Sequence, residues 1–132
     1  MGRVAENLIR HIAQIDLENE YLLIQRTDLR TPIVSDSRFR VIHFSYDIAS
    51  LRNYFCFGKV LGRYQPAVYH SLHSFLPFAI PNNVRTVVTL HDFNWIQRPS
   101  IAGRSRWRGW VSRLHGQPMH AYATRFADHI AC

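Results

Sequence analysis

Several polar side chains of this chain follow two apolar segments, at places where they could act on a substrate. His70 and Ser71 end the segment AVYHS, and His73 comes shortly after them. His91 and Asp92 directly follow the apolar segment RTVVTL. Imidazole and carboxylate groups can orient a substrate by hydrogen bonding, transfer protons or bind a metal ion. If the two segments are strands of one parallel sheet, their ends bring these side chains to one crevice.

Two kinds of chemistry and one purely structural role compete for these residues. His70, His91 and Asp92 are competent ligands for a metal-dependent hydrolase, but the chain shows no recognised metal-ligand spacing, so we expect no bound metal. A serine hydrolase is disfavoured because no Gly-x-Ser-x-Gly motif occurs. In the structural alternative, His91 only hydrogen-bonds the end of its strand and Asp92 caps the following turn.

The periodicity of the apolar residues predicts alternating helices and strands. Continuous apolar strands that alternate with amphipathic helices are typical of a mostly parallel sheet with helices on both faces. The sequence therefore predicts an α/β, Rossmann-like fold with His91 at the carboxyl end of a central strand. Helices are expected at residues 4–15 and 51–64, and at 107–126 as two short helices or one helix kinked at GQP (116–118). Strands are expected at residues 21–26, 40–45, 67–71 and 85–90, with the opening of another at 128–132.

The size and composition of the chain are those of one folded domain. The 132 residues are 47% hydrophobic, which disfavours a disordered chain, and no apolar run reaches the roughly 18 residues of a membrane span. The N-terminus lacks the apolar core of a signal peptide, so we expect a cytoplasmic protein. Cys56 and Cys132 have no metal-type spacing and are expected to be reduced thiols.

The net charge of +7 comes almost entirely from arginine, since Lys59 is the only lysine. Arginine suits bidentate contact with phosphate groups, so the composition points to an anionic partner. No recognition helix, zinc finger or aromatic RNA-binding signature accompanies the charge, and we expect no nucleic acid partner. The segment RSRWRGW (104–110) favours peripheral contact with the anionic inner face of a membrane, because Trp and Arg suit that interface.

Five motifs follow one another along the chain in a fixed order. They are GRVAENLIRHIA (2–13), ENEYLLI (18–24), VYHSLHSFLP (68–77), RTVVTLHDF (85–93) and ADHIAC (127–132). Their order and spacing resemble those of the N-terminal domain of subfamily 4 glycosyltransferases, the retaining, mannosyltransferase-like group with the GT-B fold. The resemblance covers nearly the whole chain and implies that residues 1–132 form the acceptor-side, Rossmann-like half of a GT-B fold.

The resemblance also implies roles for individual residues. His91 matches the family's active-site histidine, which hydrogen-bonds the transferred sugar near the reacting centre. Gly2 and Arg3 match the end of a glycine-rich turn, where backbone N–H groups at a helix start face the phosphates of the donor. The residues implied on the acceptor side of the crevice are Asp92, His70 and Ser71.

The activity implied by the resemblance is transfer of a hexose, often mannose, from a nucleotide sugar to a glycan or lipid-linked acceptor, without a cofactor or a bound metal. The chain departs from the family pattern, because the first strand, most of the glycine-rich turn and the C-terminal donor-binding domain do not occur in the sequence. GQP (116–118) also interrupts a helix that the family keeps continuous. We therefore expect an incomplete domain that transfers no sugar by itself. A non-catalytic polyanion-binding module, a metal-dependent hydrolase and an inactive remnant are the alternatives.

Overall fold

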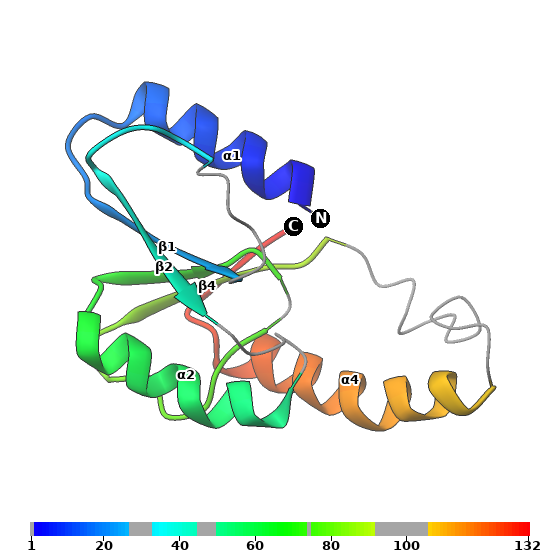
Figure 1. Cartoon of the computed structure of the whole chain (residues 1–132). Coiled ribbons are helices and arrows are strands. Elements are labelled where there is room, and N and C mark those ends of the chain that lie inside the picture. The colour runs from blue at the N-terminus through cyan, green and yellow to red at the C-terminus, as the bar shows by residue number, and fades with distance from the viewer. Residues whose placement is uncertain (1, 27–32, 45–49, 74, 92–105) are drawn as a thin grey trace. The chain divides into compact units, whose positions relative to one another are not determined.

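The computed structural model describes residues 2–26, 33–44, 50–73, 75–91 and 106–132, which Figure 1 draws in colour. It is a mixed α/β structure in which the strands form short parallel sheets. The chain divides into two compact units, Met1–Ser50 and Leu51–Cys132. Its helices and strands are α1 (Gly2–Ile15), β1 (Tyr21–Arg26), β2 (Phe39–Phe44), α2 (Leu51–Tyr64), β3 (Val68–Ser71), β4 (Arg85–Thr89), α4 (Arg106–Phe126) and β5 (His129–Ala131).

The first unit contains α1 and a two-stranded parallel sheet of β1 and β2. Tyr21 pairs with Phe39 at the start of the two strands, and their rings stack with centroids 4.7 Å apart. The sequence predicted β1 with its observed bounds, whereas β2 begins one residue before its predicted start. Phe39 joins the strand because its ring is buried against Tyr21 and its N–H donates to the carbonyl of Asp36.

Polar contacts fix the end of α1 against the strands of the first unit. The Arg38 guanidinium donates to the carbonyls of Ala13 (3.0 Å) and Asp16, where the last turn of a helix leaves carbonyls without helical partners. The Asp16 carboxylate accepts hydrogen bonds from the Tyr21 hydroxyl and from two following N–H groups. These bonds, the one from Tyr21 first, hold the pKa of Asp16 well below its usual range. The turn from α1 into β1 is therefore built around a charged carboxylate.

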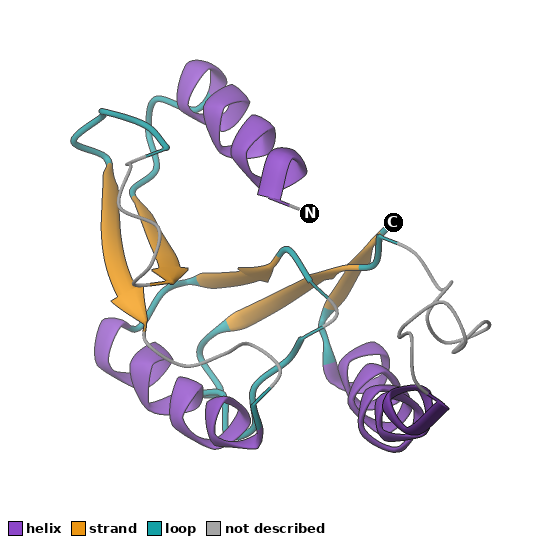
Figure 2. Ribbon diagram, turned by 45° about the vertical axis from the view of Figure 1, so that its right-hand side comes forward, coloured by secondary structure: helices purple, strands orange, loops and turns teal. Residues whose placement is uncertain are grey.

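The second unit contains a three-stranded, all-parallel sheet in the order β3-β4-β5. Helices α2 and α4 lie on the same side of this sheet (Figures 1 and 2). The parallel pairing confirms the predicted kind of strand connection, although the described strands form two sheets where the sequence predicted one. Along β4 and just after it, Thr86, Val88 and Leu90 are buried, and the latter two form a core cluster with Leu76 and with Ala123 of α4. The side chains between them point to the opposite side of the sheet.

A hydrogen-bonded clamp joins the start of β4 to the turn before β5. The Asp128 carboxylate accepts from the N–H (2.8 Å) and the hydroxyl (2.7 Å) of Thr86, and the Thr86 hydroxyl accepts from the Asp128 N–H (3.0 Å). Arg85 adds an ion pair at 3.2 Å. These bonds, those from Thr86 first, lower the pKa of Asp128. The clamp fixes the register of β5 against β4 at the amino ends of the strands.

Helix α2 has the bounds that the sequence predicted, and it packs closely on the segment between β3 and β4. The Phe78 N–H donates to the carbonyl of Tyr54 at 2.8 Å, and the Tyr54 ring lies 4.6 Å from that of Phe75. A side chain at Gly58 would meet the carbonyl oxygens of Phe78 and Ala79 at 2.6 Å. Glycine is therefore required where the helix meets this segment.

Helix α4 runs as one helix through Pro118, where the sequence left open two short helices or one kinked helix. Proline removes one helical hydrogen bond, but packing beyond it holds the helix in place. His120 and Ala123 are buried, and Ala123 belongs to the core cluster under β4. Of the segment RSRWRGW, residues 104 and 105 lie outside the described part of the chain, and only the backbone of 106–110 is described. In the described part of the chain, no helix is long and apolar enough to cross a membrane.

Candidate functional site

Two hydrogen bonds join the carboxyl ends of β3 and β4. His70 Nε2 lies 2.8 Å from Thr89 Oγ1, and His91 Nε2 lies 2.9 Å from the carbonyl oxygen of Leu72. The parallel register brings these hydrogen-bonded residues together. His70 of β3 lies beside Val87 of β4, and the segments that follow the two strands continue in the same direction. The sequence prediction that both strand ends bring histidines to one place is therefore met for His70 and His91.

The hydrogen bond of His91 defines which of its nitrogens is open to a ligand. A carbonyl oxygen can only accept, so His91 Nε2 must carry the proton that is donated to Leu72 O. In the neutral ring, Nδ1 then keeps its lone pair and acts as a hydrogen-bond acceptor. The His91 side chain is exposed, so a ligand can reach it. The arrangement suits His91 Nδ1 to accept a hydrogen bond from a hydroxyl group of a ligand.

The site faces the side of the sheet opposite to α2 and α4. Val87, Thr89 and His91 alternate with the buried residues of β4, so they lie on this opposite side, and the contact with Thr89 brings His70 there too. Ser71 is the next residue of β3 and therefore points the other way, into the buried layer. The structure brings His70 and His91 to one face and separates Ser71 from them.

Ser71 and His73 form a tight turn after β3. The Ser71 hydroxyl donates to the His73 carbonyl at 2.7 Å, and the Phe75 N–H donates to the same oxygen at 2.6 Å. The Ser71 hydroxyl thus holds the backbone that carries Leu72, the hydrogen-bond partner of His91. This contact gives Ser71 a positioning role in the structure. The resemblance implied a different role, a contact with the substrate.

Desolvation keeps two imidazoles of the site uncharged. Burial lowers the pKa of His70 and is the largest cause of the lowered pKa of His73. Both rings are therefore neutral at neutral pH. The Nδ1 atom of His73 is buried and has no hydrogen-bond partner among the described residues.

The other predicted site residues are Gly2, Arg3 and Asp92. Gly2 is the first residue of α1 and Arg3 is exposed in its first turn, so both belong to the first unit, whereas His91 belongs to the second. Asp92 lies outside the described residues. Among the described residues, no group of three or more His, Cys, Asp or Glu side chains is arranged to hold a metal ion.

Sequence reasoning missed two residues on the site's face of the sheet. Thr89 is the partner of His70, and His129 at the start of β5 lies beside Val87 on the side away from His70. The alternation in RTVVTLH already places Thr89 on the same face as His91, and this signal could have been used. His129 could not have been found in this way, because its place depends on the register between β4 and β5.

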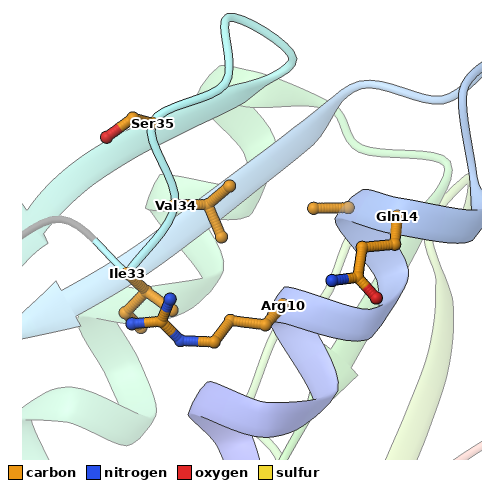
Figure 3. A pocket seen from close by; sticks show the side chains of 6 residues that line it. Arg10, Gln14, Ile33, Val34 and Ser35 are labelled. Carbon is orange, nitrogen blue, oxygen red and sulfur yellow. The ribbon is translucent and has the colours of Figure 1, made fainter.

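A pocket lies in the first unit, and none of the predicted site residues lines it. It has a volume of about 370 Å³ and lies between α1 and the segment that leads into β2 (Figure 3). Arg10 and Gln14 reach it from the helix, and Ile33 and Val34 reach it from the opposite segment. The Arg10 guanidinium already pairs with Glu6 at 2.9 Å, so it offers little uncompensated charge, and we assign no ligand to this pocket.

Comparison with known proteins gives the chain no family. No protein-family model, no curated protein and no solved structure matches it. Any conclusion about function therefore depends on the sequence motifs and on the chemistry of the residues at the ends of β3 and β4.

Proposed function

We propose that this chain is the acceptor-side domain of a retaining, mannosyltransferase-like glycosyltransferase with the GT-B fold. The α/β elements then belong to a Rossmann-like domain, and a second, donor-binding domain supplies the nucleotide sugar. In the reaction, the bond from the anomeric carbon to the nucleotide's phosphate oxygen breaks. A new bond forms to a hydroxyl oxygen of a glycan or lipid-linked acceptor, which loses its proton.

The observation that carries the proposal is the position and hydrogen bonding of His91. Ligands of parallel α/β sheets bind beyond the carboxyl ends of the strands, and His91 follows the central strand β4 of the sheet β3-β4-β5. Its ring is fixed by Leu72 O, and its Nδ1 is left as an acceptor. A fixed acceptor on an exposed imidazole is what orientation of a sugar hydroxyl requires.

The neighbouring residues support this assignment in different ways. His70 and Thr89 add a linked pair of polar groups on the same face, which suits recognition of further hydroxyls on the acceptor. Ser71 holds the turn that carries Leu72. Gly2 and Arg3 take the donor's phosphates in this proposal, because the N–H groups at the start of α1 and a cation favour an anion there.

Saccharide binding tests the proposal without requiring the donor domain. Saturation-transfer NMR of the whole 132-residue chain would be recorded with a panel of methyl hexosides, disaccharides and octyl glycosides. We expect binding of at least one member, and we expect His91→Ala to weaken it by about threefold to tenfold, the value of one neutral hydrogen bond. His43→Ala is the matched control, because His43 is an exposed histidine of β2 in the first unit.

Transfer is measured in parallel with labelled nucleotide sugars. We expect no turnover by the isolated chain, because a cleft that excludes water needs both domains. Robust turnover would refute the need for a second domain. No binding across the panel, or equal binding by His91→Ala and wild type, would refute the assignment of the acceptor site.

A further inference from the structure

The charge of the chain is divided unequally between its two units. Residues 1–50 contain six Arg and seven Asp or Glu, whereas residues 51–132 contain ten Arg or Lys and only two Asp. One of these aspartates is Asp128, which already forms an ion pair with Arg85 and accepts a hydrogen bond from Thr86. The second unit is therefore strongly basic, while the first is nearly neutral.

A row of aromatic rings crosses the helical layer of this basic unit. We call it the aromatic row. Its ring centroids lie 5.2 Å apart between Phe55 and Phe78, 4.8 Å between Phe78 and Tyr122, and 4.8 Å between Tyr122 and Phe126. It begins on α2 and ends on α4, the two helices that lie on the same side of the sheet (Figure 2). The two outer rings are 64% and 58% exposed. The members are, in order, Phe55, Phe78, Tyr122 and Phe126.

Basic side chains accompany the exposed ends of the aromatic row. Arg52 and Lys59 lie three residues before and four residues after Phe55 on α2, a spacing that puts all three on one helix face. The Arg125 guanidinium lies 5.9 Å from the ring centroid of Phe126. The surface thus combines exposed rings with cations. Among the described residues of this unit, Asp128 is the only Asp or Glu.

We propose that the aromatic row and its basic neighbours bind the surface of an anionic lipid bilayer. Aromatic side chains enter the boundary between headgroups and acyl chains, while Arg and Lys attract anionic headgroups. The proposed binding surface differs from the segment 104–110 that the sequence analysis considered. It includes residues of α2 and of the last turns of α4. Binding of this kind does not depend on sugar transfer.

The ring geometry favours a bilayer over a single-stranded nucleic acid. Bases stack on the open faces of aromatic rings. In the aromatic row, Phe55 meets Phe78 at an interplanar angle of 61° and Phe78 meets Tyr122 at 81°, so these rings contact edge to face. Tyr122 and Phe126 are tilted by 38°, so the row forms no parallel platform. An acyl boundary has no such geometric requirement, because apolar burial is non-directional.

Vesicle flotation of the whole chain tests the proposal. We expect binding to vesicles of equal parts phosphatidylcholine and phosphatidylglycerol at low salt, and little binding to phosphatidylcholine alone. Each basic residue near an anionic surface contributes about fivefold, so Lys59→Gln with Arg125→Gln should weaken binding about 25-fold. Phe55→Ser with Phe126→Ser should weaken it by about tenfold or more through lost apolar burial.

Matched double variants of the first unit are the controls. Arg10→Gln with Arg40→Gln removes two exposed charges, and Ile15→Ser with Leu17→Ser removes two side chains that are 80% and 72% exposed. We expect both to bind as wild type does. All four positions changed in the aromatic row and its neighbours are exposed, and circular dichroism verifies that the variants fold.

Three results would overturn the proposal. These are equal binding to neutral and anionic vesicles, equal loss in the control variants, and retention of RNA, but not of vesicles, that disappears in the Lys59→Gln, Arg125→Gln variant. The last result would identify a nucleic acid as the partner of the basic unit.

Discussion

Two glycines of α2 should respond in opposite directions to the same substitution. A Cβ at Gly58 would lie 2.6 Å from the backbone oxygens of Phe78 and Ala79, a distance at which α2 and this segment must move apart. A Cβ at Gly62 would have its nearest neighbour, a side-chain carbon of Pro81, at 3.9 Å, which is ordinary van der Waals contact. Both glycines lie inside the helix, so helix propensity favours alanine equally at each.

The two effects can be separated in magnitude. Replacing a helical glycine by alanine gains about 1 kcal/mol, which is the expected stabilisation by Gly62→Ala. Forcing extra atoms into a packed site costs about 1–3 kcal/mol, and at Gly58 the opposing atoms are backbone, which cannot rotate away. Gly58→Ala should therefore be destabilised by up to roughly 2 kcal/mol after the helix term is included, and the two variants should differ by about 1–3 kcal/mol.

Urea unfolding followed by circular dichroism measures this difference in the free energy of unfolding. Thermal unfolding gives a second readout, in which a change of 1 kcal/mol should move the thermal midpoint by roughly 3–5 °C in a chain of this size. Gly58→Ala should also weaken saccharide binding, because Phe78 belongs to the same connection between β3 and β4 as Leu72 and His73. If Gly58→Ala is as stable as Gly62→Ala, the close approach of α2 to this connection is refuted.

Other substitutions test the connection, the clamp and the absence of a metal. Ala79 has φ 56°, a left-handed conformation that strains a residue with a Cβ, so Ala79→Gly should raise the unfolding free energy by about 0.5–1 kcal/mol in the same urea assay. The pKa of Asp128 is lowered in the fold, so its stabilisation is present above the unfolded value of about 3.9 and is lost as the pH falls through the folded pKa. Urea midpoints measured from neutral to acid pH should therefore fall more steeply below about pH 4 in wild type than in Asp128→Asn. Dialysis against EDTA should leave the thermal midpoint unchanged, and stoichiometric zinc or manganese by mass spectrometry would instead favour the metal-dependent hydrolase.

The local elements of the fold could be predicted from sequence because their signals are local. YLLIQR and the helix from Leu51 to Tyr64 have the observed bounds, since apolar periodicity and the nearby Pro66 mark them. Phe39 was missed as the start of β2 because its inclusion depends on stacking with Tyr21, which is 18 residues away in sequence. Pro118 suggested a break in α4 for a similar reason, since the burial of Ala123 that holds the helix beyond it is a tertiary effect.

The candidate site was predictable to the extent that strand ends are predictable. The sequence placed His91 at the end of an apolar strand and His70 at the end of another, and the parallel pairing of β3 and β4 brings both to one face. Which face each side chain takes is set by strand alternation, and this separates Ser71 from its neighbour His70. The tautomer of His91 depends on Leu72 O, a backbone atom that no motif reveals.

The clamp between Thr86 and Asp128 has a consequence for the kinetics of folding. The two residues are 42 positions apart, so the bond closes a long loop that contains α4. Closing such a loop costs chain entropy before any contact rewards it, so the clamp should form late, after α4 has packed on β4. Interactions absent from the folding transition state act on the unfolding rate. The clamp therefore sets how long β5 stays on the sheet once folded, and its loss should speed the release of β5 while folding proceeds at nearly its original rate.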